Sequence, residues 1–131
     1  MLPAVPDDLA PFLAQVAAAA DLCLKPCRHG VRFRDPEPAA AAPSDCCLRI
    51  EARDPAGGRC EDADVELEIY RSGSELNLML SRCADPDAPL LWHGSHAVWM
   101  DGASGERCSR PADGAALEAL ARRIRALVSG D

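Results

Sequence analysis

The feature that most constrains this sequence is a run of alternating apolar and polar residues on both sides of Gly73. The apolar positions are Val65, Leu67 and Ile69 before the glycine and Leu76, Leu78 and Leu80 after it. Successive side chains of a strand point to opposite faces of a sheet, so a period of two predicts a strand with one apolar face. The run therefore predicts an antiparallel hairpin with one face buried and the other wet.

The turn of this hairpin sets the pairing of its strands. A two-residue turn at Ser72-Gly73 would close it. The register that follows joins the three apolar residues of one strand to the three of the other, as Ile69–Leu76, Leu67–Leu78 and Val65–Leu80. A slip by one residue would turn one apolar set to the wrong face, so the turn and the pattern predict the same register.

Helical spacing appears on both sides of the strands. Apolar residues recur every three or four positions within residues 9–23 and again within 117–128, which predicts two amphipathic helices. Pro26 ends the first helix, and Asp113 can cap the second. Extended segments are expected at 31–33, 46–53, 90–93 and 96–100, with a short edge strand at 106–109.

This order of elements predicts an α+β fold. We expect an antiparallel sheet of about four to six strands, a meander of hairpins, with the N-terminal and the C-terminal helix packed on one face. The 131 residues suit one domain, 1–131. Within it, residues 35–45 (DPEPAAAAPSD) have three prolines and no periodicity, so we expect a mobile connector there.

Charge and composition exclude some classes of partner. The net charge is −7, which argues against a nucleic acid, because phosphate binding depends on lysine and arginine. No apolar run reaches membrane-spanning length, and the N-terminus has no basic region typical of a secretory signal. The seven cysteines are an odd number, so we expect free thiols and a cytoplasmic protein.

Two groups of cysteines and histidines could ligate a metal. Cys23, Cys27 and His29 follow one another at the end of the first predicted helix. His93 and His96 flank Gly94-Ser95, and a two-residue turn there would place the two imidazoles opposite each other. Zinc takes four nitrogen or sulfur ligands, so these five residues form a candidate zinc site if both groups converge.

Simpler interpretations compete with this zinc site. Cys23 lies on the apolar stripe of its helix and can pack as a small hydrophobic residue, while the two histidines can be exposed turn residues. A redox role is a third interpretation, because the basic residues Lys25, Arg28 and His29 would favour the thiolate of Cys27.

Three other features have structural interpretations. The acidic residues of 61–64, together with Glu66 and Glu68, predict a solvated acidic face, since no calcium-loop spacing is present. Cys46 is expected in the core and Cys47 on the outside of its strand. Trp92 and Trp99 are expected on one side of the second hairpin, as core or interface residues.

The leading interpretation of function is a small, non-enzymatic module that contacts a protein partner or a second copy of itself. No phosphate-binding loop, dinucleotide fingerprint, nucleophile elbow or zinc-protease motif occurs in the chain, and no cofactor is expected. A metal- or thiol-handling protein is the alternative, with zinc as the metal. A small enzyme with a pocket between sheet and helices is the third hypothesis.

Overall fold

The periodicities of the sequence fold into one antiparallel sheet and two helices. The computed structural model describes residues 10–34, 46–112 and 114–129. The helices are α1 (Ala10–Cys23) and α2 (Gly114–Ser129), and a single turn of 3₁₀ helix (Glu61–Ala63) precedes the third strand. The strands are β1 (Arg28–Phe33), β2 (Cys46–Arg53), β3 (Val65–Ser72), β4 (Glu75–Arg82), β5 (Leu90–His93) and β6 (Ala97–Met100).

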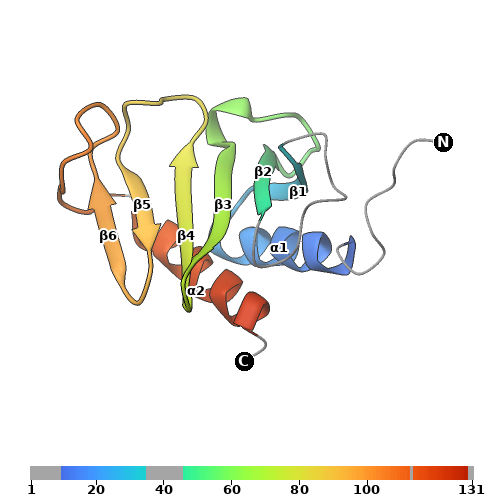
Figure 1. Ribbon diagram of the computed structural model, residues 1–131. Coiled ribbons are helices and arrows are strands. Elements are labelled where there is room, and N and C mark those ends of the chain that lie inside the picture. The colour runs from blue at the N-terminus through green and yellow to red at the C-terminus, as the bar shows by residue number, and fades with distance from the viewer. Residues whose placement is uncertain (1–9, 35–45, 113, 130–131) are drawn as a thin grey trace.

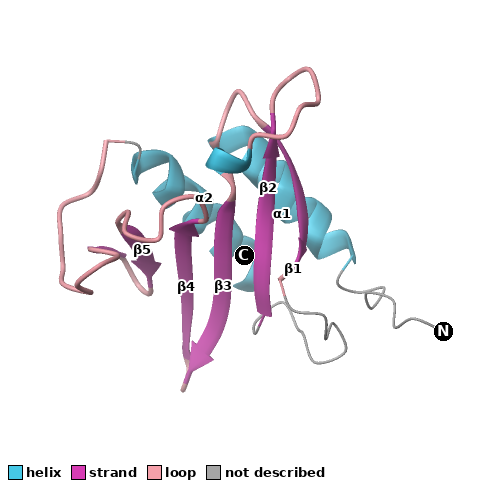
Figure 2. Cartoon of the chain, turned by 90° about the horizontal axis from the view of Figure 1, so that it is seen from above, coloured by secondary structure: helices cyan, strands magenta, loops and turns pink. Residues whose placement is uncertain are grey.

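The sheet is a meander in which each strand pairs with its neighbours in sequence, in the order β1-β2-β3-β4-β5-β6. Both helices lie on one side of it, with α1 behind β1 and β2 and α2 behind β4 and β5 (Figures 1 and 2). The two helices also contact each other. The α+β class and the six-stranded meander confirm the fold class expected from the sequence.

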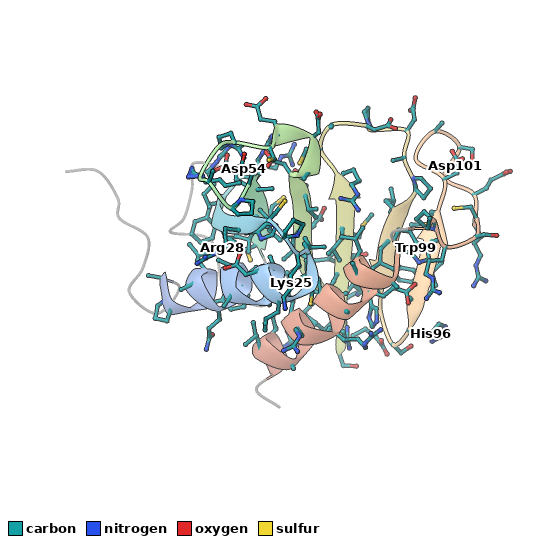
Figure 3. The ribbon with its side chains drawn as sticks, turned by 180° about the vertical axis from the view of Figure 1, so that it is seen from behind. Lys25, Arg28, Asp54, His96, Trp99 and Asp101 are labelled. Carbon is teal, nitrogen blue, oxygen red and sulfur yellow. The ribbon has the colours of Figure 1, made fainter. Side chains whose placement is uncertain are left out.

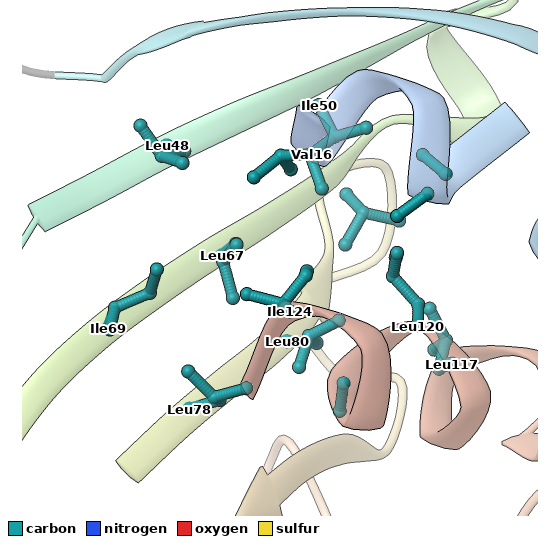
Figure 4. Packing of buried hydrophobic residues seen from close by; sticks show 14 of the residues in the cluster. Val16, Leu48, Ile50, Leu67, Ile69, Leu78, Leu80, Leu117, Leu120 and Ile124 are labelled. Carbon is teal, nitrogen blue, oxygen red and sulfur yellow. The ribbon is translucent and has the colours of Figure 1, made fainter. Parts of the chain in front are cut away.

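The core lies between the sheet and the two helices. The alternating residues of β2, β3 and β4 are buried and pack on the apolar stripes of the helices (Figure 4). The largest side chains that are completely buried include Val16, Leu48, Ile50, Leu67, Ile69, Leu78, Leu80, Leu120 and Ile124. Burial of this one face of the sheet explains why the period of two was so regular in the sequence.

The register of the central hairpin differs from the expected one. Ile69 lies opposite Leu78 and Leu67 opposite Leu80, two positions along from the predicted pairs. The turn is Gly73-Ser74, because Ser72 and Glu75 still pair as strand residues. Gly73 has φ +65°, which suits glycine at the first position of a type II′ turn. A slip of two residues keeps every side chain on its face, so the predicted faces are correct although the predicted pairs are wrong.

The second hairpin also departs from expectation, and with larger consequences. Its loop has three residues, 94–96, so His93 lies opposite Ala97 and the two histidines do not face each other. The extra residue changes which side chains share a face. Trp99 lies opposite the buried Leu91, whereas Trp92 lies opposite Val98 on the other side of the sheet. The expectation that both tryptophans lie on one side is therefore wrong.

Other predicted elements have mixed outcomes. The strand predicted at 46–53 is confirmed as β2. Residues 106–109 contribute a single bridge between Arg107 and Met100 instead of a strand. The predicted connector at 35–45 and the predicted cap Asp113 lie outside the described residues.

Candidate interaction surface

The face of the sheet that points away from α1 and α2, hereafter the open face, carries the side chains that alternate with the buried set. Its two halves differ in chemistry. Across β1, β2 and β3 the outward residues are mostly charged, whereas across β4, β5 and β6 they are mostly apolar.

The charged half is organised around Asp64, which is completely buried just before β3. The backbone N–H of Ala52 donates to Asp64 Oδ1 at 2.8 Å. Arg59 donates to both carboxylate oxygens, at 3.0 and 2.8 Å, and Arg49 donates to Oδ2 at 3.0 Å. A buried carboxylate needs such partners, because a charge that is removed from water and left without a counterion destabilises the fold by about 3–5 kcal/mol.

These donors also control the protonation of Asp64. Burial by itself would raise the pKa of this carboxyl group. The hydrogen bonds from Arg59, Ala52 and Arg49 outweigh burial and hold the pKa well below its usual range. Asp64 is therefore a structural anion, and the expectation of a solvated acidic face over 61–64 is wrong for this residue.

Further ion pairs continue across the charged half. Arg59 also approaches Glu51 at 3.6 Å, and Arg32 contacts the same Glu51 oxygen at 3.2 Å. Arg34 pairs with Glu66 at 2.6 Å. Most charges in this half are thus already matched within the chain, so the surface is a network of paired charges and not a basic or an acidic patch.

The apolar half is a cluster of partly exposed side chains, hereafter the apolar strip. Met79, Trp92 and Val98 lie side by side on three successive strands. Leu90 and Met100 form a second cross-strand pair beside them. All five are partly exposed, and neither α1 nor α2 covers this face (Figure 2). Cross-strand neighbours of this kind form one continuous apolar surface.

A shallow hollow of about 330 Å³ opens at one end of the apolar strip. Tyr70, Asn77 and Trp92 line it, together with Gly94, whose missing side chain leaves the space. The indole nitrogen Nε1 of Trp92 is buried, and no hydrogen-bond acceptor for it lies among the described residues. An orphaned donor of this kind costs about 1–3 kcal/mol, so stability alone does not explain Trp92.

The five residues of the candidate zinc site are not brought together. Cys23, Cys27 and His29 lie at the end of α1 and in or beside β1, at one edge of the sheet. His93 ends β5, four strands away, which at the usual strand spacing is roughly 19 Å. Arg28, the neighbour of His29, lies far from His96 in Figure 3.

His29 and His93 each have local partners of their own. His29 Nδ1 lies 3.0 Å from Asp21 Oδ1, and its side chain is almost completely buried. His93 Nδ1 lies 3.2 Å from the carbonyl oxygen of Gly94. Burial and the nearby Arg125 lower the pKa of His93, which favours the neutral imidazole.

The described residues contain no group of three or more His, Cys, Asp or Glu side chains that could hold one metal ion. Metal binding by either half of the predicted zinc site on its own stays a prediction.

The thiols of the chain are free, and three of them are poor nucleophiles. Burial raises the pKa of Cys47, Cys60 and Cys83. Neighbouring carboxylates raise these pKa values further, and the thiol of Cys27 adds to the shift at Cys60. Since the thiolate is the reactive form, these three thiols are less reactive at neutral pH than an exposed cysteine.

Comparison with known proteins places the chain in a family. The family model described as Domain of unknown function (DUF8659) matches residues 13–127, which include every strand and most of both helices. The chain belongs to this family. No curated protein and no solved structure gives a significant match. Within the described residues, no helix is long and apolar enough to cross a bilayer.

The apolar strip was missed by the sequence reasoning, although the sequence carries a signal for it. Residues 78–80, 90–92 and 97–100 are consecutive apolar residues, and do not alternate with polar residues as those of β3 do. A strand that is apolar at successive positions is apolar on both faces. Because both helices cover the other face of this sheet, neither of them packs on the second apolar face.

Proposed function

We propose that this protein is a non-enzymatic protein-interaction module that docks a protein on the apolar strip. One observation carries the proposal. Both helices cover the same face of the sheet, while Met79, Leu90, Trp92, Val98 and Met100 stay partly exposed on the other. Contiguous exposed apolar side chains with a polar rim are typical of protein-binding sites.

The kinds of residue in the apolar strip support this use. Tryptophan and methionine are enriched in protein interfaces, and tryptophan is the commonest energetic anchor. Trp92 lies at the centre of its row, between Met79 and Val98. Glu68 flanks this row on β3. The arrangement has the apolar centre and charged rim of an interface.

The partner that we propose is a protein, either another chain or a second copy of this one, and not a nucleic acid. Arg32, Arg49 and Arg59 of the open face are engaged by carboxylates of the same chain. Arginines that are already paired have little left to offer to phosphates. We also propose a cytoplasmic location, which the seven free cysteines support.

Metal and thiol handling receive less support as functions. The groups that would share a zinc ion lie at distant parts of the sheet, and burial raises the pKa of three thiols. An accessory role through protein contact requires only the apolar strip, and neither metal binding nor thiol chemistry.

Site-directed photo-crosslinking tests the docking surface. A photoreactive amino acid replaces Val98 in the apolar strip, and the protein is irradiated in the cells that make it. We expect one adduct of discrete mass from this position, because its side chain would lie inside the interface. Trp92→Glu, placed in the same chain, should abolish the adduct, since a charge at the centre of an apolar interface is left desolvated.

The matched control places the same photoreactive residue at Arg122, which is exposed on α2. Little or no adduct is expected there, because that helix faces away from the apolar strip. Equal adducts from both positions, or none from position 98, would contradict the proposed docking surface.

A further inference from the structure

One row of side chains across the open face is acidic at one end and basic at the other. Such a row is complementary to a copy of itself that is rotated by half a turn. This row begins with Glu66 on β3, which lies opposite Ser81 on β4. The β4–β5 register continues the row to Leu90, which lies opposite Met100. Met100 in turn bridges Arg107. The row therefore reads acidic, polar, apolar, apolar and basic across the sheet.

The neighbouring row supplies the apolar centre. It runs from Glu68 through Met79 and Trp92 to Val98. Residues that pair directly across strands lie on the same face, so both rows point away from the helices. Leu90 and Trp92 both belong to β5, which makes β5 the middle of the two rows.

We propose that a second copy of this chain covers the apolar strip, through a two-fold axis that runs parallel to β5. The proposal rests on the proposed function and names its partner. A rotation about such an axis maps β4 onto β6 of the other copy and leaves β5 facing β5. It also brings Glu66 of each copy to Arg107 of the other, while the Trp92 side chains of the two copies meet at the centre.

Charge is the reason to prefer a second copy to an unrelated protein. Acidic Glu66 and basic Arg107 lie on opposite sides of β5. One strand separates each of them from it: β4 on the side of Glu66 and β6 on the side of Arg107. A two-fold interface needs self-complementarity of this kind, because each patch meets the same patch of the partner. A uniformly acidic rim would repel its own copy and would favour a basic partner instead.

The geometry of sheet packing agrees with this arrangement. Two sheets that pack face to face lie about 10 Å apart, with their strands at roughly 30°, and their facing side chains interdigitate. The glycine at position 94 and the hollow beside Trp92 leave room on each copy for the other's side chains. Glu66 also pairs with Arg34 in its own chain, yet its side chain stays 31 % exposed and can contact a second arginine.

Charge reversal at the two ends of the row tests the dimer. Light scattering after size exclusion should give the untagged protein twice the 13.9 kDa mass of one chain over a wide concentration range. Glu66→Arg and Arg107→Glu should each weaken the dimer about tenfold or more, because each puts like charges together twice. Mixing the two variants should restore a dimer that contains one of each, and so should the double variant Glu66→Arg/Arg107→Glu.

The matched control is Glu68→Arg. This exposed residue follows Glu66 on the same face of β3, but its row has no arginine at the far end. It should change the dimer much less than Glu66→Arg does. Far-ultraviolet circular dichroism of each variant checks that the sheet is intact, because Glu66→Arg also removes the ion pair with Arg34.

Two outcomes overturn the inference, and they differ in what they mean for the proposed function. A monomer at every concentration, with a position-98 adduct to a different protein, excludes the second copy but leaves the docking surface in place. A dimer that neither charge reversal nor Trp92→Glu weakens places self-association elsewhere on the molecule. Absence of both the dimer and the adduct contradicts the inference and the proposed function together.

Discussion

Asp64 is a residue whose role depends on its surroundings and not on its sequence neighbours. In the chain it ends an acidic run, but in the fold it is completely buried. The carboxylate binds three groups from two segments of chain: the N–H of Ala52 and the side chain of Arg49, both in β2, and the side chain of Arg59 from the following turn. It thereby fixes the end of β2 against the start of β3.

Removal of this charge should destabilise the fold. Asp64→Asn keeps the shape but leaves Arg49 and Arg59 without their counterion. We expect a loss of about 3 kcal/mol in the free energy of unfolding, near the lower end for a broken buried ion pair, because both arginines still reach water. Urea denaturation at neutral pH measures the loss. Glu68→Gln, on the exposed side of β3, is the control and should change stability little. An Asp64→Asn protein as stable as the parent would show that the carboxylate is dispensable.

Strand pairing is decided at the scale of the element, where turn chemistry matters more than pattern. The alternation in β3 and β4 correctly predicted that the apolar set faces the core, because burial follows a period of two, although Asn77 on the other face is buried as well. It could not predict which residues pair, because registers that differ by two residues bury the same faces. The position of Gly73 could have decided this, since a type II′ turn requires glycine first and not second.

Gly73 should therefore be sensitive to substitution. Its φ of +65° disfavours a side chain, although a Cβ atom there would meet no other atom. Gly73→Ala should destabilise the protein by about 1–2 kcal/mol through backbone strain alone. Gly73→Asn should cost less, because asparagine tolerates positive φ better than alanine. Thermal unfolding of the two variants checks this order, and equal stability of the alanine variant and the parent would argue against the turn at 73–74.

The two faces of β4 offer a second comparison at this scale. Leu78 is completely buried against the helices, whereas its neighbour Met79 is partly exposed in the apolar strip. Leu78→Ala should cost about 2–5 kcal/mol, as truncations of buried leucine do. Met79→Ala should cost clearly less in folding, but should weaken docking on the open face. Paired urea-denaturation and light-scattering measurements separate the two effects, and similar folding losses would contradict the assignment of faces.

At the scale of the whole molecule, the fold class was predictable and the candidate site was not. Periodicity alone predicts the two helices, the strands and the buried face of each, because every element of such a fold buries one apolar face against another element. The site depends on details that periodicity does not contain. One additional residue in the loop 94–96 puts Trp92 and Trp99 on opposite faces of the sheet. The burial of Asp64 depends on Arg49 and Arg59, which only the folded chain brings to the same carboxylate.

The pH dependence of stability should combine contributions from across the molecule in two separate ranges. Burial lowers the pKa of His93 from 6.5, so the unfolded chain binds this proton more tightly than the folded one. The contribution of His93 is therefore complete above pH 6.5 and is lost as the pH falls below it. The pKa values of Asp64 and Asp101 are lowered from 3.8, so their contribution is lost only as the pH falls below that value.

Urea denaturation from neutral pH to strong acid, at one protein concentration, should show both ranges of loss. His93→Gln cannot take up a proton and should flatten the upper range while leaving the lower one, whereas His96→Gln, at an exposed loop position, should leave both. Asp64→Asn should flatten the lower range. An upper range that persists in His93→Gln would mean that another group titrates there, and stability that rises as the pH falls below 6.5 would reverse the sign expected for a histidine that is buried in its neutral form.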